Sequence, residues 1–473
     1  MLTRVNILLI LILILAAFFR LYKIEALHGF AADADLYSWI VKDIIIEKHF
    51  RLVGQLTSTE GIYAGVGFYY LLAPFFLITK MDPIGAVIFA TLVGLLTVVS
   101  FYFVFRKLIS TNAGLVGAFL QAILPLRVGY DRWVVPSITV NLWCVWFFYT
   151  LLKILKGERK YLIPGLFLAG LIWHVHLALT PLILLLPLSV ILSKKSPGKK
   201  VFFLGVLAFI LPMLPFILFE FRHNFLQTMS FYNAFSVGTN VTLLEKTLKI
   251  LNESLGSNFY LKIFLLFLPV ILYRTRKINL KLLIIFYGWI FSVIGFFIFS
   301  SKESSEYYFT STQTIFLILI VYLLVWIANV KKLGKILAII ILIIVFLYSV
   351  NDLFLQTENG KGFKQKMAVA QFIKNDSLDK NLPCLSITYI TSPGENTGFR
   401  YLFWFNNLKL EESKAGIPNY TIVLPFNLSA GSVEKKFGII GVIVPSGYNL
   451  RESAGNCTGK DFNLSEPFWG YTD

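Results

Sequence analysis

The sequence predicts an all-α polytopic membrane protein that carries a small soluble α/β domain at its C-terminal end. Of its 473 residues, 57% are hydrophobic and only 15% are charged, far fewer than the quarter usual in soluble domains. The apolar residues form continuous runs, for example 5–19, 201–219 and 336–347. Continuous runs of this kind are typical of membrane helices, because a bilayer leaves backbone polar groups no partner outside a helix or a closed barrel.

About eleven full crossings are expected from these runs. They lie near 5–22, 83–105, 112–127, 137–155, 161–178, 180–193, 201–219, 260–273, 281–300, 310–329 and 335–350. The first run predicts a retained anchor, since Arg20 to Lys23 follow it where a signal peptide would have small residues for cleavage. Another apolar stretch, 66–79, is short and contains Pro74.

The distribution of charge predicts the orientation. Basic residues cluster between the expected crossings, at 106–107, 156–160, 194–200, 274–277 and 331–335. All these clusters share the side of the N-terminus if 66–79 is a re-entrant or interfacial segment, as the positive-inside rule requires. We therefore expect a multi-pass plasma-membrane protein with a cytoplasmic N-terminus. The net charge of +17 comes from these loops and does not indicate nucleic-acid binding.

Three regions follow from this topology. Residues 1–350 form the transmembrane domain, within which 24–82 is the first exoplasmic loop, and 351–473 form the exoplasmic soluble domain. In the soluble domain we expect a helix near 363–374 and strands near 384–390, 421–425 and 438–444. Its two cysteines, Cys384 and Cys457, either pair in an oxidising compartment or stay free.

Two carboxylates, Asp33 and Asp35, follow the first crossing closely. After them comes a stretch with Leu36, Trp39 and Ile40 near one face, which predicts an amphipathic helix lying along the membrane surface. An Asp-x-Asp pattern alone is equally typical of solvated loop charges.

Several features of this region together resemble a known superfamily. The first span ends in Phe-Arg-Leu-Tyr at 19–22, the loop has an early Asp and an amphipathic helix, and an aromatic stretch GFYYLLAP follows at 67–74. This arrangement resembles the GT-C glycosyltransferases, and among them the protein O-mannosyltransferase and aminoarabinose transferase-like branch. The resemblance extends over about the first 310 residues and is strongest over 18–80.

The resemblance implies an inverting membrane glycosyltransferase of the cell envelope. It would move a hexose or pentose from a polyprenyl-phosphate carrier to a protein, lipid or glycan acceptor. Asp33 takes the place of the family's key Asp, which implies a catalytic carboxylate that accepts the proton of the attacking hydroxyl. Ala34 replaces the family's Glu, so Asp35 is expected to assist. A divalent cation such as Mg²⁺ or Mn²⁺ is compatible with Asp-x-Asp, as is its absence.

Other residues on the same expected side are candidates for binding the carrier phosphate or the substrate. They are Tyr37, Tyr70, Asp131, Arg132, His176, Glu220, Arg222, His223 and Tyr307. Cations suit the phosphate, and tyrosine or histidine suits a hydroxyl or a sugar face. Each also has a structural alternative: a local ion pair, a packed histidine, a snorkelling arginine or an interfacial aromatic belt.

Two other functions remain open at this point. A secondary transporter or lipid-linked glycan flippase would place ionisable groups at mid-membrane and carry internal repeats, and no repeat is visible. A non-catalytic scaffold would have no deep cavity beside Asp33.

Overall fold

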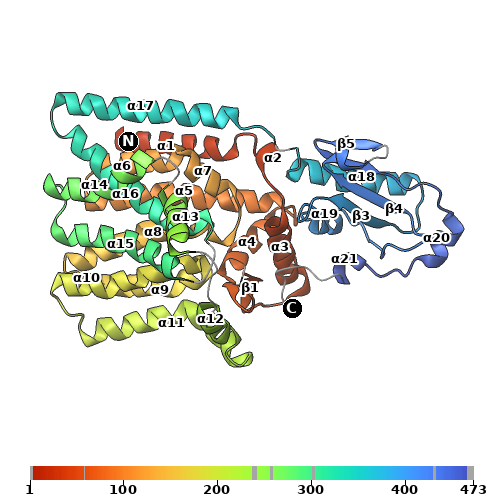
Figure 1. The fold of residues 1–473 in the computed structure, drawn as a ribbon, viewed down its shortest axis with the longest axis horizontal. Helices are drawn as coiled ribbons and strands as arrows, with labels where there is room; N and C mark the ends of the chain where they lie inside the picture. Colours follow the sequence, from red (N-terminus) through yellow and green to blue (C-terminus); the bar gives the residue numbers. More distant parts are fainter. Residues whose placement is uncertain are drawn as a thin grey trace.

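The computed structural model describes residues 4–57, 59–236, 242–255, 259–300, 304–358, 360–429 and 433–465. A bundle of roughly parallel helices forms one part, and an α/β unit lies beyond one end of the bundle (Figure 1). The first loop, with α3 and α4, lies between the two (Figure 1). The predicted class, a helical membrane protein with a small C-terminal α/β domain, is confirmed.

Seven helical segments of the described part are long and apolar enough to cross a bilayer. They are α1 (Arg4–Leu21), α5 (Ile84–Leu108), Pro136–Leu155 with α8 (Val140–Leu155), α11 (Lys199–Arg222), α15 (Leu280–Phe299), Glu306–Ala328 with α16 (Thr310–Ala328), and α17 (Lys332–Leu355). An eighth crossing results if α6 (Thr111–Ile123) and α7 (Pro125–Arg132) form one span bent by 60°. The break falls at Pro125, whose ring cannot continue the hydrogen-bond ladder of the preceding helix.

The remaining expected crossings are shorter or broken, so the number eleven stays a prediction. The stretches expected at 161–178 and 180–193 form α9 (Leu162–Val175), a 3₁₀ segment η4 (Leu177–Leu184) and α10 (Leu185–Ser193). The crossing near 260–273 corresponds to α14 (Phe259–Arg274).

Helix α4 (Gly67–Ile78) corresponds to the apolar stretch near 66–79 and has 12 residues. It spans only about 18 Å, whereas the hydrocarbon core is about 30 Å thick. A helix of this length cannot cross the bilayer alone, in agreement with the expected interfacial or re-entrant segment.

The C-terminal unit contains the expected helix and strands. They are α18 (Phe363–Asp379), β3 (Ser386–Thr391), β4 (Asn419–Leu424) and β6 (Ile440–Ile443), together with an unanticipated short strand, β5 (Lys435–Phe437). The sheet order is β3-β4-β6-β5, in which β3 and β4 are parallel and the other pairs antiparallel. The buried residues of β4 and β6 join those of α18 in one hydrophobic core.

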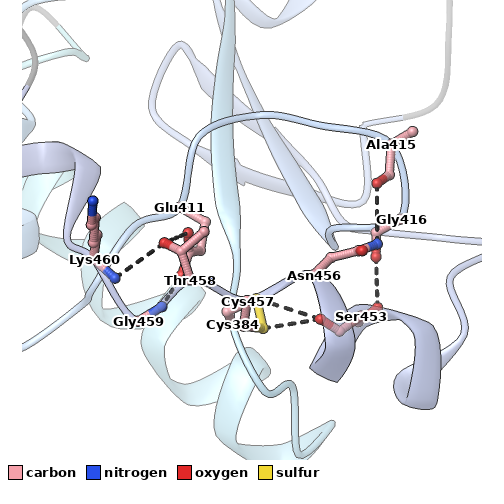
Figure 2. The surroundings of a disulfide bond; sticks show 10 residues. All are labelled: Cys384, Glu411, Ala415, Gly416, Ser453, Asn456, Cys457, Thr458, Gly459 and Lys460. Atoms are coloured by element: carbon pink, nitrogen blue, oxygen red, sulfur yellow. Dashed lines mark hydrogen bonds between the residues drawn. A yellow bond between two sulfur atoms is a disulfide. The ribbon is translucent and has the colours of Figure 1, made fainter.

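A disulfide between Cys384 and Cys457 holds the end of this unit in place (Figure 2). It joins the chain just before β3 to the residue that follows α20 (Leu450–Asn456). Nearby, the Glu411 carboxylate accepts the backbone N–H groups of Thr458 and Gly459, both at 2.8 Å. The chain then returns through α21 (Phe462–Ser465) toward α19 (Arg400–Phe405), where Asn463 Nδ2 donates to the Arg400 carbonyl.

The first loop docks directly against the C-terminal unit. It contains α2 (Ile24–Leu27), α3 (Ala32–Lys42), the π-helical turn η1 (Asp43–Glu47), and a hairpin of β1 (Val53–Leu56) and β2 (Tyr63–Gly65). The fully buried carboxylate of Asp35 accepts the backbone N–H of Tyr401 at 2.7 Å, of Gly398 at 3.1 Å and of Arg400 at 3.2 Å. A carboxylate at the start of a helix satisfies N–H groups that lack intrahelical partners. Asp35 therefore fastens α3 to the first turn of α19.

The expectation that α3 lies along the membrane surface with a solvated polar face is wrong. Residues 34–45 are buried, including Lys42 and Asp43, so α3 does not lie with a solvated polar face on the membrane surface. Lys42 is satisfied by an ion pair with Glu47 at 2.7 Å and lies over the rings of Trp39 and Trp404. The C-terminal unit supplies Trp404, a partner that the local periodicity of α3 could not reveal.

Replacing Asp35 with Asn should loosen the attachment of the C-terminal unit. One carboxylate oxygen becomes an NH₂ group that faces backbone donors, which costs about 2 kcal/mol for the buried contact. We expect faster proteolysis between α17 and α18, measured by limited digestion in detergent. The exposed Asp379→Asn variant serves as control; equal digestion of both variants would contradict this role.

Candidate functional site

A cavity of about 570 Å³ lies between the first loop and the bundle. Its polar lining comes from the first loop, the C-terminal end of α9 and the turn η5 (Glu306–Phe309), with Asp33, Gln55, His176 and Tyr307 among the residues. Its apolar lining comes mainly from α9, α11 and α15, with Ile172, Trp173, Phe209, Met213, Phe216, Phe296 and Phe297 among the residues. The cavity therefore joins polar groups of the loop to an apolar space between membrane helices.

Asp33 lies in the first turn of α3 and lines this cavity with a half-buried side chain. Burial raises the pKa of the Asp33 carboxyl above its ordinary value, and a hydrogen bond with the Gln55 side chain partly lowers it. A carboxyl group with a raised pKa, facing a largely apolar cavity, is suited to accept a proton from a hydroxyl group. The sequence singled out Asp33, but it gave no indication of Gln55.

Asp35 lies away from the cavity, because α19 engages both of its oxygens. Asp33 and Asp35 therefore do not converge on one point, as a metal ion held by both would require. Within the described ranges, no group of three or more His, Cys, Asp or Glu side chains comes together as a metal site. Asp33 and Asp35 therefore do not form the joint Mg²⁺ or Mn²⁺ site considered from the Asp-x-Asp pattern.

Two histidines line the cavity, and their hydrogen bonds indicate their tautomers. His174 Nδ1 accepts the Gly67 N–H at 3.1 Å, and its Nε2 lies 2.7 Å from the Pro212 carbonyl, to which it donates. His176 Nδ1 accepts the Ala178 N–H at 3.2 Å, so a neutral His176 carries its proton on Nε2. His174 is thus a link between elements, whereas His176 lines the cavity and caps η4 through its Nδ1.

The aromatic candidates separate into one that lines the cavity and two that do not. Tyr307 lines it, with its ring packed edge-on against Trp133 at 5.4 Å and against His176 at 5.7 Å. Tyr37 is fully buried next to Asp33, outside the lining. Tyr70 donates its hydroxyl to the Arg51 carbonyl at 3.0 Å and also lies outside the lining.

Asp131 and Arg132 join helices rather than line the cavity. The Asp131 carboxylate is buried and accepts from Arg20 Nε at 2.9 Å. The Arg132 guanidinium donates to the Phe19 carbonyl at 2.7 Å, the Tyr22 carbonyl at 2.8 Å and Gln356 Oε1 at 2.7 Å. These two residues of α7 therefore hold α1 and the end of α17 together.

The candidates at the end of α11 are also absent from the cavity lining. Glu220 accepts the backbone N–H groups of Gln227 and Thr228, both at 3.0 Å, and so caps α12 (Leu226–Ser236). Arg222 is exposed, and the exposed His223 stacks on Phe219 at 4.0 Å between ring centroids. Among the described residues, the cavity lining contains no lysine or arginine.

The fold resembles that of solved membrane transferases. ArnT from Cupriavidus metallidurans matches in its apo state with a TM-score of 0.60 and 10% identity, over 92% of this chain and 97% of that one. The same protein bound to undecaprenyl phosphate gives a TM-score of 0.58 and 11% identity over the same shares. The oligosaccharyltransferase of Archaeoglobus fulgidus in its apo form gives 0.49 at 12% identity, over 89% of this chain and 69% of that one.

No family model matches the sequence, and no curated protein matches it either. The structural likeness therefore bears on the fold and not on individual residues. It extends over 92% of this chain in the match to ArnT.

The two arginine candidates should behave differently when truncated. Arg132→Ala removes three hydrogen bonds and leaves two carbonyls without their donor, so we expect a loss of about 2 kcal/mol and a lower melting temperature. Arg222→Ala removes an exposed side chain and should change the stability by less than about 0.5 kcal/mol. Thermal unfolding in detergent measures both, and equal melting temperatures would contradict the assigned contacts.

Proposed function

We propose that this chain, which has the GT-C fold, is an inverting glycosyltransferase that takes a sugar from a polyprenyl-phosphate carrier. The observation that carries the proposal is the position of Asp33, whose raised-pKa carboxyl faces a cavity of about 570 Å³ that continues between membrane helices. The ArnT neighbour that binds undecaprenyl phosphate supports the choice of carrier.

In the proposed reaction, Asp33 accepts the proton of an acceptor hydroxyl as its oxygen attacks the anomeric carbon. The bond between that carbon and the phosphate oxygen breaks, and the phosphate leaves on the carrier as an anion. Attack from the opposite face inverts the anomeric centre, as in inverting glycoside hydrolysis. Because the phosphate is a good leaving group, it does not need protonation by a strong acid. The reaction needs a base that accepts the proton of the attacking hydroxyl.

The cavity also suits the carrier itself. Its apolar lining from α9, α11 and α15 matches an isoprenoid chain, which would enter from the bilayer. The polar side chains of His176 and Tyr307 line the cavity and would contact the carrier phosphate, which carries a single charge while the sugar is attached. Among the described residues, Arg132 and Arg222 do not line the cavity, so His176 and Tyr307 are the candidates for this contact.

We place the reaction on the exoplasmic side of the plasma membrane. The Cys384–Cys457 disulfide supports this side, because disulfides persist in oxidising compartments. The C-terminal unit and the first loop share one hydrophobic core, so both lie on the same side of the bilayer. The sugar and the acceptor, whether protein, lipid or glycan, are left open by the cavity.

Neither alternative function is favoured. A scaffold would have no deep cavity beside Asp33, whereas one is present. A transporter would use ionisable groups inside the bundle, but Asp131 is paired with Arg20, and Arg127 donates to Asn141 Oδ1 at 2.6 Å and to Thr314 Oγ1 at 3.0 Å. These contacts serve the packing of α1, α7, α8 and α16.

Asp33→Asn should strongly reduce transfer from tritiated sugars linked to undecaprenyl phosphate, leaving a small residual rate. Loss of a general base costs about 10²- to 10⁴-fold in rate. In the unmodified protein, kcat/KM should fall as the pH drops through the raised pKa of Asp33, since only the deprotonated carboxylate can accept the proton. The pH at which kcat/KM falls should lie above the ordinary pKa range of an aspartate. The residual activity of Asp33→Asn should not show this fall at low pH.

The matched control is Glu60→Gln, which removes an exposed carboxylate from the same loop. It should keep the rate and the pH profile of the unmodified protein. Full transfer by a folded Asp33→Asn variant would overturn the assignment of Asp33.

The orientation has a separate test in intact cells. A membrane-impermeant maleimide should label Glu60→Cys, in the exposed hairpin, and should not label Lys156→Cys, at an exposed basic loop, until the membrane is permeabilised. Labelling in the reverse order would place the first loop in the cytosol and remove the basis for an exoplasmic reaction.

A further inference from the structure

We propose that Gln55, held by Tyr69, is a positioning residue that fixes the Asp33 carboxylate in the orientation used for sugar transfer. The inference rests on the proposed function, but it concerns a residue outside the aspartate pattern of the first loop. Gln55 lies in β1 and lines the cavity together with Asp33.

The hairpin that carries Gln55 is fastened to α4 through Tyr69. The Gln55 backbone N–H donates to the Tyr69 oxygen at 3.2 Å, and the Tyr69 hydroxyl donates to Gln55 Oε1 at 2.9 Å. Tyr69 is fully buried. A Cβ atom added to the neighbouring Gly54 would lie 2.3 Å from Tyr69 Cε2, so β1 packs directly onto the tyrosine ring.

These two bonds determine which way the Gln55 amide faces. The Tyr69 oxygen accepts from the Gln55 backbone, and its single proton is donated to Oε1. The Gln55 NH₂ group is therefore the part of the amide that remains for Asp33, which lines the same cavity and whose pKa Gln55 lowers. An ionised carboxylate can only accept, so in the proposed arrangement the Gln55 NH₂ group donates to Asp33.

This arrangement gives Gln55 two effects on Asp33. It limits the carboxylate to one rotation about its side chain, which matters because a reacting group must be held within a narrow geometry. It also lowers the pKa of Asp33, because a donor stabilises the charged carboxylate, and so it opposes the increase in pKa that burial causes. Removing the donor should therefore raise this pKa further. It should lower the ionised fraction of the carboxylate at a given pH and leave its orientation less fixed.

Other titratable groups face Asp33 from several elements: Tyr37 on α3, Tyr69 on α4, and Tyr307 on η5. His174 and His176 line the same cavity. A pH profile of activity alone can therefore mix their titrations with that of Asp33. A readout on the Asp33 carboxyl itself avoids this difficulty.

The experiment uses the full chain in detergent with two readouts. The first is the pH dependence of kcat and KM with the best donor from a panel of tritiated undecaprenyl-phosphate sugars. The second is the pH midpoint of carbodiimide labelling at Asp33, measured by mass spectrometry without substrate, because carbodiimides react with protonated carboxyl groups.

The variants are Gln55→Leu, Gln55→Glu and Tyr69→Phe. Tyr287→Phe is the control, since it removes a tyrosine hydroxyl bonded to the Leu266 carbonyl elsewhere in the bundle.

We expect Gln55→Leu to raise the labelling midpoint and the acidic limb of kcat by about one pH unit, with a larger fall in kcat than change in KM. Gln55→Glu, which keeps the size but adds a like charge, should raise both further. Tyr69→Phe should give a smaller shift in the same direction, and Tyr287→Phe should give none.

An unchanged labelling midpoint in both Gln55 variants would overturn the inference, and so would a fall in rate that is equal at every pH. Failure of the proposed function has a different signature. The unmodified protein would then transfer no sugar from any donor, while the labelling midpoint would still report whether Gln55 controls Asp33.

Discussion

The arrangement of this molecule depends on a single buried carboxylate, that of Asp35. Its three backbone hydrogen bonds to the start of α19 fix α3 against the C-terminal unit. Asp33, two residues earlier, lies on the other side of this contact and lines the cavity. The C-terminal unit thus supports the helix that carries Asp33. The two aspartates of the Asp-x-Asp pattern have different positions, since Asp35 joins α3 to α19 and Asp33 lines the cavity.

The remaining walls of the cavity follow from the way the first loop enters the bundle. Tyr69 and Gln55 fasten the hairpin to α4, and Gln227 accepts the Tyr63 N–H at 2.9 Å to fasten the same hairpin to α12. A Cβ on Gly65 would lie 2.5 Å from His174 Nδ1, so β2 also packs closely on α9. These contacts bring the end of the apolar helices next to Asp33 and create one space that can hold both a polar head and an apolar chain.

Features with a strong local signal could be predicted from the sequence: the helical membrane class, α18, three of the four C-terminal strands, and Asp33 as the candidate carboxylate. Long-range partners could not. Arg132 and Asp35 each have the residue type of a binding group, yet the carbonyls and N–H groups that engage them come from distant segments. Gln55 had no signal at all, because its importance arises only from Tyr69 and Asp33, which are 14 and 22 residues away in the chain.

The central claim is that the cavity holds a polyprenyl phosphate with its head at Asp33. The most direct measurement is photo-crosslinking with an undecaprenyl phosphate that carries a diazirine on its first isoprenoid units, followed by mapping of the adducts by mass spectrometry. The claim predicts adducts on Met213 and Phe216 of α11, removed by excess unlabelled undecaprenyl phosphate. Adducts confined to the exposed outer surface of α17, without such competition, would contradict it.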